Sequence, residues 1–220
     1  CIKVHNSSQN KTNMQIKDNN TAECTESQEN SLLEIHDYDE LPPFFMSLIS
    51  RDNLWAFISS RGSLSAGRES AEKSIFPYVT VDKIHDSYGT TGPRTMIRLK
   101  GNELWEPFTP HASKKPDLER TLSKGALGNS ICFEEKRIQD GLSFKYRWQP
   151  AGRFGLARTA CLENRGNQAV QLNVLDGIAN ILPPGLDSRM QANSSVLTDA
   201  YKQSELQANF RMAVYSTASG

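Results

Sequence analysis

Eight residues, Leu142-Ser143-Phe144-Lys145-Tyr146-Arg147-Trp148-Gln149, alternate large apolar side chains with polar ones. A period of two is typical of a β-strand, because successive side chains of a strand point to opposite faces of the sheet. The stretch therefore predicts a strand with one solvated face and one buried face, the buried face carrying Phe144, Tyr146 and Trp148.

Strand-like segments continue on both sides of this stretch. Residues 131–138 precede it through Gln139-Asp140-Gly141, which has the composition of a hairpin turn. Residues 154–163 and 169–175 follow it, separated by the polar turn at 164–168. Four consecutive strands with short turns predict an antiparallel meander. Long strands with one wet face predict a sheet packed on one side, as in a large sandwich.

The remaining segments predict further strands and little helix. Strand candidates are residues 44–50, 54–60, 78–84, 95–100 and 104–108. Residues 110–128 are polar and basic without a clear period, which predicts an excursion from the sheet. Residues 194–210 form the only good helix candidate, with Leu197 and Tyr201 at helical spacing. The predicted fold class is mostly β, an antiparallel sandwich with one short helix near the C-terminus.

The composition divides the chain into a tail and a domain. Residues 1–30 are rich in Asn, Ser, Thr, Gln and Lys, so we expect a disordered polar tail that cannot bury enough apolar surface to order itself. Residues 41–220 are expected to form one β-sandwich domain. The missing initiator Met and the strand-like run at 213–220 suggest a piece of a larger protein. Cys1 before a polar tail would also suit a mature bacterial lipoprotein, which leaves a cell-surface or periplasmic location open.

Charge and cysteine usage exclude several classes of partner. Lys plus Arg and Asp plus Glu both total 25, so nothing global favours nucleic acid or an anionic membrane. No apolar run approaches the roughly 20 residues of a membrane span. The four cysteines and four histidines lack metal-ligand spacing, so we expect no metal and no cofactor. Cys132 and Cys161 lie in apolar strand patterns as small hydrophobes, and a bridge between them stays open.

No complete catalytic motif is present in the sequence. It contains neither G-x-S-x-G nor a phosphate-binding glycine loop. Glycoside chemistry uses carboxylates in pairs, but Glu134 and Glu135 are adjacent in a strand and must point to opposite faces. The segment that leads into the first strand is expected to be exposed to solvent, together with its carboxylates Asp37, Asp39 and Glu40. Asp176 follows an apolar strand. It is either a catalytic carboxylate or, more simply, a turn carboxylate that accepts hydrogen bonds from nearby backbone amides.

The tryptophans supply the one candidate binding group. Trp55 and Trp148 suit the core, whereas Trp105 borders the polar excursion, where it would stack on a sugar ring or cover the sheet. Arg61 and Arg68 flank a glycine-punctuated loop whose backbone can approach a ligand closely. Arg61, Arg68 and Trp105 are therefore the predicted substrate-binding residues, and no catalytic residue is predicted. The alternative is that both arginines make surface ion pairs and Trp105 only packs.

Short motifs resemble the N-terminal domain of cellobiose-phosphorylase-like enzymes, of the glycosyltransferase 36 or glycoside hydrolase family 94 type. The motifs are the loop at 59–68, SSRGSLSAGR, followed by Phe76-Pro77-Tyr78, and the hairpin ACLEN at 160–164 with the strand at 170–176 beyond it. Residues 180–183 and 199–202 are also similar. The resemblance covers about residues 41–218. The chain departs from the phosphorylases in its longer polar tail and its less aromatic loop.

The resemblance implies a β-supersandwich of the galactose-mutarotase type, followed by an (α/α)6 barrel that carries the catalytic acid. It implies a non-catalytic domain that supports this barrel, helps to form a homodimer and contributes to a site for an oligosaccharide or a phosphorylated sugar. The parent would be a cytoplasmic glycoside phosphorylase or hydrolase. Two rivals remain: a stand-alone bacterial surface carbohydrate-binding module, and a mutarotase-like epimerase, which would need a paired histidine and carboxylate.

Overall fold

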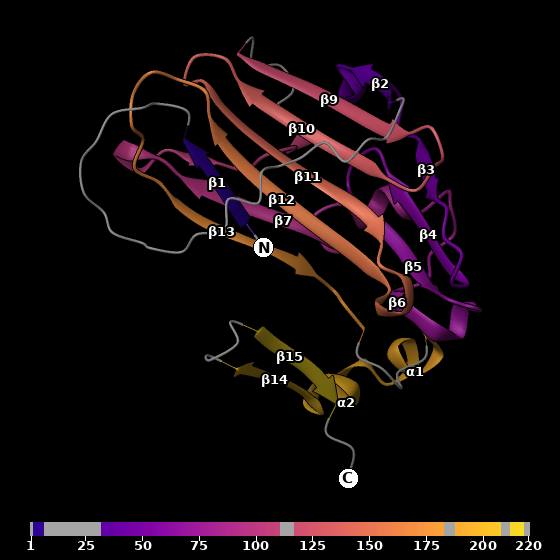
Figure 1. Cartoon of the computed structure of the whole chain (residues 1–220). Helices are drawn as coiled ribbons and strands as arrows, with labels where there is room; N and C mark the ends of the chain where they lie inside the picture. Colours follow the sequence, from indigo (N-terminus) through magenta and orange to yellow (C-terminus); the bar gives the residue numbers. More distant parts are fainter. Residues whose placement is uncertain (1, 7–31, 111–116, 183–187, 208–211, 218–220) are drawn as a thin grey trace. The chain divides into compact units, whose positions relative to one another are not determined.

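The computed structural model describes residues 2–6, 32–110, 117–182, 188–207 and 212–217 (Figure 1). The chain divides into two compact units, and each is described by itself. Unit 1 comprises residues 1–42 and 95–176, and unit 2 comprises residues 43–94 and 177–220.

A six-stranded sheet forms the larger part of unit 1. Its strand order is β1-β12-β11-β10-β9-β2, and all neighbours are antiparallel except β1 and β12. The long central strands follow the sequence order of a meander. The strands are β1 (Ile2–Asn6), β2 (Leu32–His36), β9 (Leu118–Gly125), β10 (Ile131–Arg137), β11 (Leu142–Pro150) and β12 (Leu156–Asn164).

One face of this sheet carries the core of unit 1, as the alternation predicts. Phe144, Tyr146 and Trp148 are all at most 3% exposed, which confirms the prediction for β11. On β10, Phe133 stands opposite Tyr146 and the two rings stack with centroids 5.0 Å apart. Burial of such rings is the main source of stability in a sandwich.

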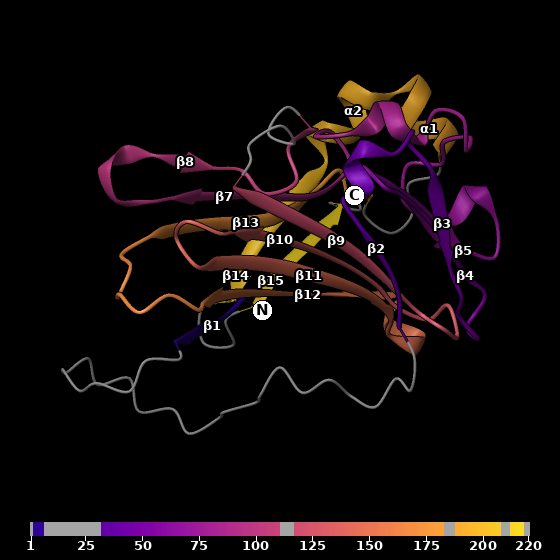
Figure 2. The same cartoon turned by 90° about the horizontal axis from the view of Figure 1, so that it is seen from above.

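A second layer, most of whose residues belong to unit 1, covers that apolar face. It is a three-stranded sheet of order β13-β7-β8, with β7 (Gly92–Arg98), β8 (Leu104–Trp105) and β13 (Asn173–Ala179). Figure 2 shows β7 and β8 running along the face of the larger sheet. Side chains join the layers: Trp105 of β8 donates to Glu135 of β10, and Arg158 of β12 binds Asp176 of β13. Unit 1 is therefore a β-sandwich, in agreement with the predicted mostly-β fold class.

Unit 2 is built on an antiparallel four-stranded sheet of order β3-β4-β5-β6. Gly67 of β5 is required because a Cβ there would lie 2.5 Å from the Trp55 ring and 2.7 Å from the Lys73 carbonyl oxygen. Trp55 is half-buried on the face that Gly67 leaves open. The elements are β3 (Phe45–Leu48), β4 (Leu54–Ser59), β5 (Leu64–Arg68), β6 (Ser74–Phe76), α1 (Ser188–Asn193), α2 (Ser195–Ala200), β14 (Lys202–Gln207) and β15 (Met212–Thr217).

Several short 3-10 helices connect these elements. They are η1 (Tyr38–Glu40), η2 (Ala71–Lys73), η3 (Ile84–Ser87), η4 (Lys100–Asn102) and η6 (Gly152–Phe154). The prediction of a strand at 78–84 is wrong, because that segment is irregular and ends in η3. Its backbone bonds to a side chain instead of a neighbouring strand: the Val79 N–H donates to Ser65 Oγ, which in turn donates to the Pro77 carbonyl.

Three further sequence predictions need correction. Residues 118–125, predicted as part of an excursion, form the central strand β9, so the four-stranded meander is β9 to β12 and β13 belongs to the other layer. The single helix predicted at 194–210 is replaced by α1, α2 and the β14–β15 hairpin. Residues 2–6, expected in a flexible tail, form β1 beside β12. Residues 7–31 lie outside the described residues.

The two described cysteines cannot form a disulfide. Cys132 stands opposite Arg147 on β11, whereas Cys161 stands opposite Lys145, so β11 separates them and their registers differ by two residues. Two inter-strand spacings alone amount to about 9.6 Å, beyond the roughly 7 Å that a disulfide tolerates between Cα atoms. Neither cysteine is part of a disulfide. Among the described residues, no helix is long and apolar enough to cross a membrane.

Candidate functional site

A cavity of about 540 Å³ in unit 1 is the best candidate for a binding site. It lies where the β7–β8 hairpin meets the turn between β10 and β11 and the start of β9. Its volume falls within the range of small-molecule sites, roughly 300–1,000 Å³. The lining combines one indole, one guanidinium, one amide and four carboxylates, in the residues Glu103, Leu104, Trp105, Glu106, Thr109, Asp117, Leu118, Arg137, Gln139 and Asp140.

Arg137 at the end of β10 organises the polar side of the cavity. Its Nε donates to Asp140 Oδ2 at 2.6 Å and its Nη2 donates to Glu103 Oε1 at 2.8 Å. Its guanidinium carbon lies 5.6 Å from the centroid of the Trp105 ring, within cation–π range. The arginine side chain is 15% exposed, so these contacts hold its planar donor group in one orientation.

Trp105 forms the aromatic part of the wall and is 4% exposed. Its Nε1 donates to Glu135 Oε1 at 2.6 Å, and the backbone N–H of Phe108 donates to Oε2 of the same carboxylate at 2.6 Å. Glu135 has no solvent exposure. The indole is thus fixed by a hydrogen bond to a buried charge as well as by packing.

Arg120 neutralises Glu135 from the neighbouring strand β9. Its Nε donates to Glu135 Oε2 at 2.8 Å, its Nη1 to Asp39 Oδ2 at 3.0 Å, and its Nη2 to the Thr109 carbonyl at 2.9 Å. The prediction that Asp39 is a solvated carboxylate is therefore wrong, since its side chain is only 15% exposed. Nearby, burial raises the pKa of the Tyr38 hydroxyl well above its ordinary value.

Two tight turns deliver the polar groups to the cavity. The β7–β8 turn passes through Gly101 at φ +83°, which places Glu103 and Trp105 beside the sheet. The β10–β11 turn carries Gln139 and Asp140 and passes through Gly141 at φ +65°. A Cβ on Gly141 would lie 2.7 Å from the Gly166 nitrogen, so only glycine lets the two loops approach this closely.

The three sequence-predicted binding residues lie in different places. Trp105 lines the cavity of unit 1, while Arg61 and Arg68 belong to unit 2. Arg61 is exposed in the turn after β4, and Arg68 ends β5 opposite Leu54 at the start of β4. The two arginines therefore stand at opposite ends of the β4–β5 hairpin and do not converge. Arg68 Nη1 donates to the Asp52 carbonyl at 3.4 Å.

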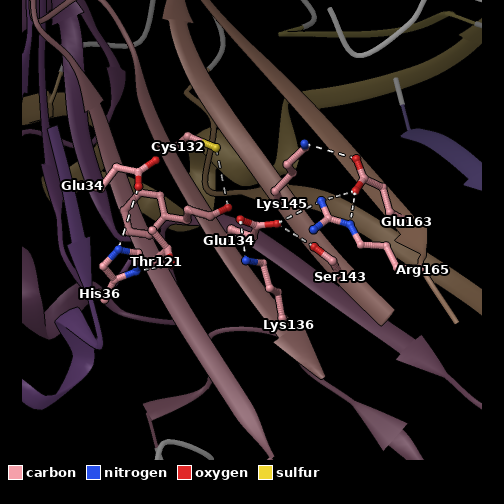
Figure 3. Close-up of polar contacts among 11 residues, drawn as sticks. Glu34, His36, Thr121, Cys132, Glu134, Lys136, Ser143, Lys145, Glu163 and Arg165 are labelled. Carbon is pink, nitrogen blue, oxygen red and sulfur yellow. Dashed lines mark hydrogen bonds and ion pairs between the residues drawn. The ribbon is translucent and has the colours of Figure 1, made fainter. Parts of the chain in front are cut away.

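The outer face of the large sheet carries a second polar cluster, shown in Figure 3. Lys145 and Arg165 both bind the Glu163 carboxylate, with the closest N–O distances 3.2 and 2.7 Å, and Ser143 donates to Glu134. Burial acts to raise the pKa of Glu163, but the hydrogen bond from Arg165 and the charge of Lys145 outweigh it and the pKa is lowered overall. The cluster pairs opposite charges across strands, which is the arrangement of a solvated sheet face.

The remaining candidate groups have structural partners. Asp176 lies within β13 and not in a turn, and it binds the side chains of Arg158 and Thr95. Glu134 and Glu135 face opposite sides of β10, as the alternation predicts. Cys132 is half-buried, and desolvation raises the pKa of its thiol. Within the described part of the chain, no group of three or more His, Cys, Asp and Glu residues could hold a metal ion.

The residues predicted from the sequence include Trp105 of this cavity but none of the polar groups around it. These groups come from two segments more than 30 residues apart, and only the packing of the β8 sheet against the β10 sheet brings them together. They are Glu103, Arg137, Gln139 and Asp140. The one local signal is the hairpin sequence at 139–141, which predicts a turn but no ligand contact. No protein-family model and no curated protein matches this chain.

Proposed function

We propose that this chain is a non-catalytic, sugar-binding β-sandwich domain of a larger carbohydrate-active protein. The observation that carries the proposal is the cavity of unit 1, where the Trp105 indole adjoins an oriented guanidinium, an amide and several carboxylates. Sugar sites combine an aromatic group for the C–H surface of the ring with planar polar groups for its hydroxyls. The cavity brings both kinds of group into one place, with the indole, 4% exposed, as part of its wall and not as an open stacking face.

The charge of the lining favours a neutral sugar over a phosphorylated one. Four carboxylates and one guanidinium line the cavity, and the guanidinium of Arg137 is already paired with Glu103 and Asp140. A phosphate would meet the carboxylates of Glu106 and Asp117 without a free cation from the lining, whereas sugar hydroxyls can donate to carboxylates and accept from Gln139. The proposed ligand is therefore a short neutral oligosaccharide or one end of a longer chain.

A non-catalytic role is supported by the pairing of the buried carboxylates. Glu135 and Asp39 bind Arg120, and Asp176 binds Arg158. Each of these carboxylates is bound by an arginine and none of them lines the cavity, so none is placed to act on a ligand there. The reaction of the parent, phosphorolysis or hydrolysis of an oligosaccharide in an (α/α)6 barrel, and the galactose-mutarotase type of the sandwich belong to the same proposal and rest on the sequence resemblance.

Isothermal titration of the full chain with neutral oligosaccharides, including cello-oligosaccharides, tests the proposal. We expect binding in the millimolar range or tighter, weakened by Gln139→Ala and unchanged by Arg61→Ala, an exposed arginine of unit 2. Glucose 1-phosphate should bind more weakly than a neutral disaccharide. Glu106→Gln should reduce this difference in affinity, because it removes one carboxylate that repels the phosphate. No binding by any neutral sugar, or equal loss in the Arg61→Ala control, would reject the site.

A further inference from the structure

The wall of the cavity between Trp105 and Thr109 is held from behind by two buried charged residues. Glu135 accepts the Trp105 Nε1–H and the Phe108 backbone N–H, one on each carboxylate oxygen. Arg120 donates to Glu135 and to the Thr109 carbonyl. Trp105 and Thr109 line the cavity, while Glu135 and Arg120 do not. The two charged residues thus contact the wall from the side away from the ligand.

Both residues stand on interior strands of the six-stranded sheet of unit 1. Glu135 is on β10 and Arg120 on β9, directly opposite each other in the register of the large sheet. Glu135 is fully buried and Arg120 is 3% exposed. The wall itself contains only the two-residue strand β8 followed by irregular backbone, in which Phe108 has φ +66°. Without the network, few backbone bonds would fix the conformation of residues 106–109.

Stability alone is a weak reason for such a network. Replacing a buried ion pair by well-packed apolar residues is often neutral or stabilising, because desolvation of two charges offsets their attraction. An apolar replacement, however, could not bind an indole N–H, a backbone N–H and a backbone carbonyl at the same time. The feature unique to this pair is that it orients three polar groups of one cavity wall.

We propose that Glu135 and Arg120 are positioning residues that preorganise the Trp105–Thr109 wall of the cavity for its ligand. The inference rests on the proposed sugar-binding function. A wall that is already ordered loses less conformational entropy when the ligand binds, so affinity is gained without any direct contact to the sugar. Glu135 and Arg120 act through Trp105, Phe108 and Thr109, and touch no ligand themselves.

The test uses Glu135→Gln in the full chain. Glutamine keeps the size of the side chain, but its NH2 group faces either the Trp105 N–H or both the Phe108 N–H and Arg120 Nε, so one or two of the three donors lose their acceptor. We expect the Trp105 indole N–H resonance to move upfield, because a neutral acceptor binds it more weakly than a carboxylate. Amide exchange of Phe108 should accelerate by about tenfold or more relative to the amides of β11.

Asp176→Asn is the matched control. It weakens the other buried ion pair of unit 1, and Asp176 contacts none of the wall residues. It should lower the urea midpoint while leaving the Trp105 resonance, the relative exchange rate of Phe108 and the affinity of the folded protein unchanged. Arg120→Lys is the second variant, since a single ammonium cannot reproduce the three bonds of the guanidinium. Arg120→Lys should also accelerate amide hydrogen exchange of Phe108 in the cavity wall.

The two proposals fail in different ways. Wall exchange and the indole resonance need no ligand, so they test positioning even if no oligosaccharide binds. Selective loosening of the wall in Glu135→Gln and Arg120→Lys, with an affinity for the neutral oligosaccharide about tenfold lower, supports the inference. It is overturned if exchange rises uniformly across unit 1 as in Asp176→Asn, or if the folded variants bind the sugar as tightly as the unchanged chain.

Discussion

The guanidinium of Arg158 donates two hydrogen bonds to the carboxylate of Asp176, from Nη1 to Oδ2 at 2.6 Å and from Nη2 to Oδ1 at 2.8 Å. The side chains are 5% and 6% exposed, and Thr95 Oγ1 donates a third bond to the carboxylate at 2.6 Å. The Arg158 guanidinium also lies 4.9 Å from the Tyr146 ring centroid. This contact fastens β12 of the large sheet to β13 of the covering layer.

Removing one partner of this pair should therefore destabilise unit 1 strongly. We expect Asp176→Ala to lower the free energy of unfolding by about 3–5 kcal/mol, because it leaves the Arg158 charge buried without a counter-ion. Urea denaturation followed by fluorescence in a Trp55→Phe background reports on Trp105 and Trp148 of unit 1. Arg165→Ala removes a half-exposed ion-pair partner of Glu163 and should cost about 1 kcal/mol or less. Equal effects of the two substitutions would refute this account of the pair.

Gly141→Ala should be more damaging than Gly101→Ala. Both glycines have positive φ, so an alanine at either position costs about 1–2 kcal/mol in backbone strain. Only Gly141 also lacks space, since its Cβ would meet the Gly166 backbone, whereas nothing lies within 4 Å at Gly101. The extra clash should add about 1–3 kcal/mol. Thermal unfolding of the two variants measures the difference, and a Gly141→Ala variant no less stable than Gly101→Ala would contradict the close loop contact.

The acid titration of Glu163 should report its two cationic neighbours. Its folded-state pKa lies below the ordinary glutamate value of 4.5, so the unfolded chain takes up a proton first as the pH falls. The contribution of the ionised Glu163 to folding stability is complete above the unfolded-state pKa of 4.5 and is lost as the pH falls through the folded-state pKa. Carbon-detected NMR of the carboxyl group measures this pKa directly. Arg165→Ala should raise it, while Lys136→Ala, which removes a cation 3.8 Å from Glu134, should not.

Periodicity was sufficient to predict the strands whose inward positions are all apolar. In β11 the apolar residues mark the buried face without interruption, and the flanking turn gives the register with β10. Strand β9 was missed because its inward positions include Arg120, so its alternation reads as polar. The buried position of an arginine depends on Glu135 and Asp39, which are distant in the chain, and no local pattern reveals it.

The helix predicted at 194–210 shows a different limit. Leu197 and Tyr201 do have helical spacing, and α2 begins at Ser195, one residue after the predicted start. The helix ends at Ala200 because residues 202–207 pair with β15, a non-local interaction that outweighs local propensity. The same limit applies to the cavity: Trp105 could be proposed from its residue type, but Arg137 and Asp140 join it only through tertiary structure.

Chemical-shift mapping of the full chain with a neutral oligosaccharide tests the sugar site most directly. Three tryptophan indole N–H resonances can be followed, and the structure assigns one to the cavity, one to the core and one to unit 2. We predict that the Trp105 resonance and the Gln139 side-chain amide shift saturably together, while the indoles of Trp55 and Trp148 stay in place. Saturable shifts at Trp55 with none at Trp105, or no shift with any neutral sugar, would contradict the assignment of this cavity.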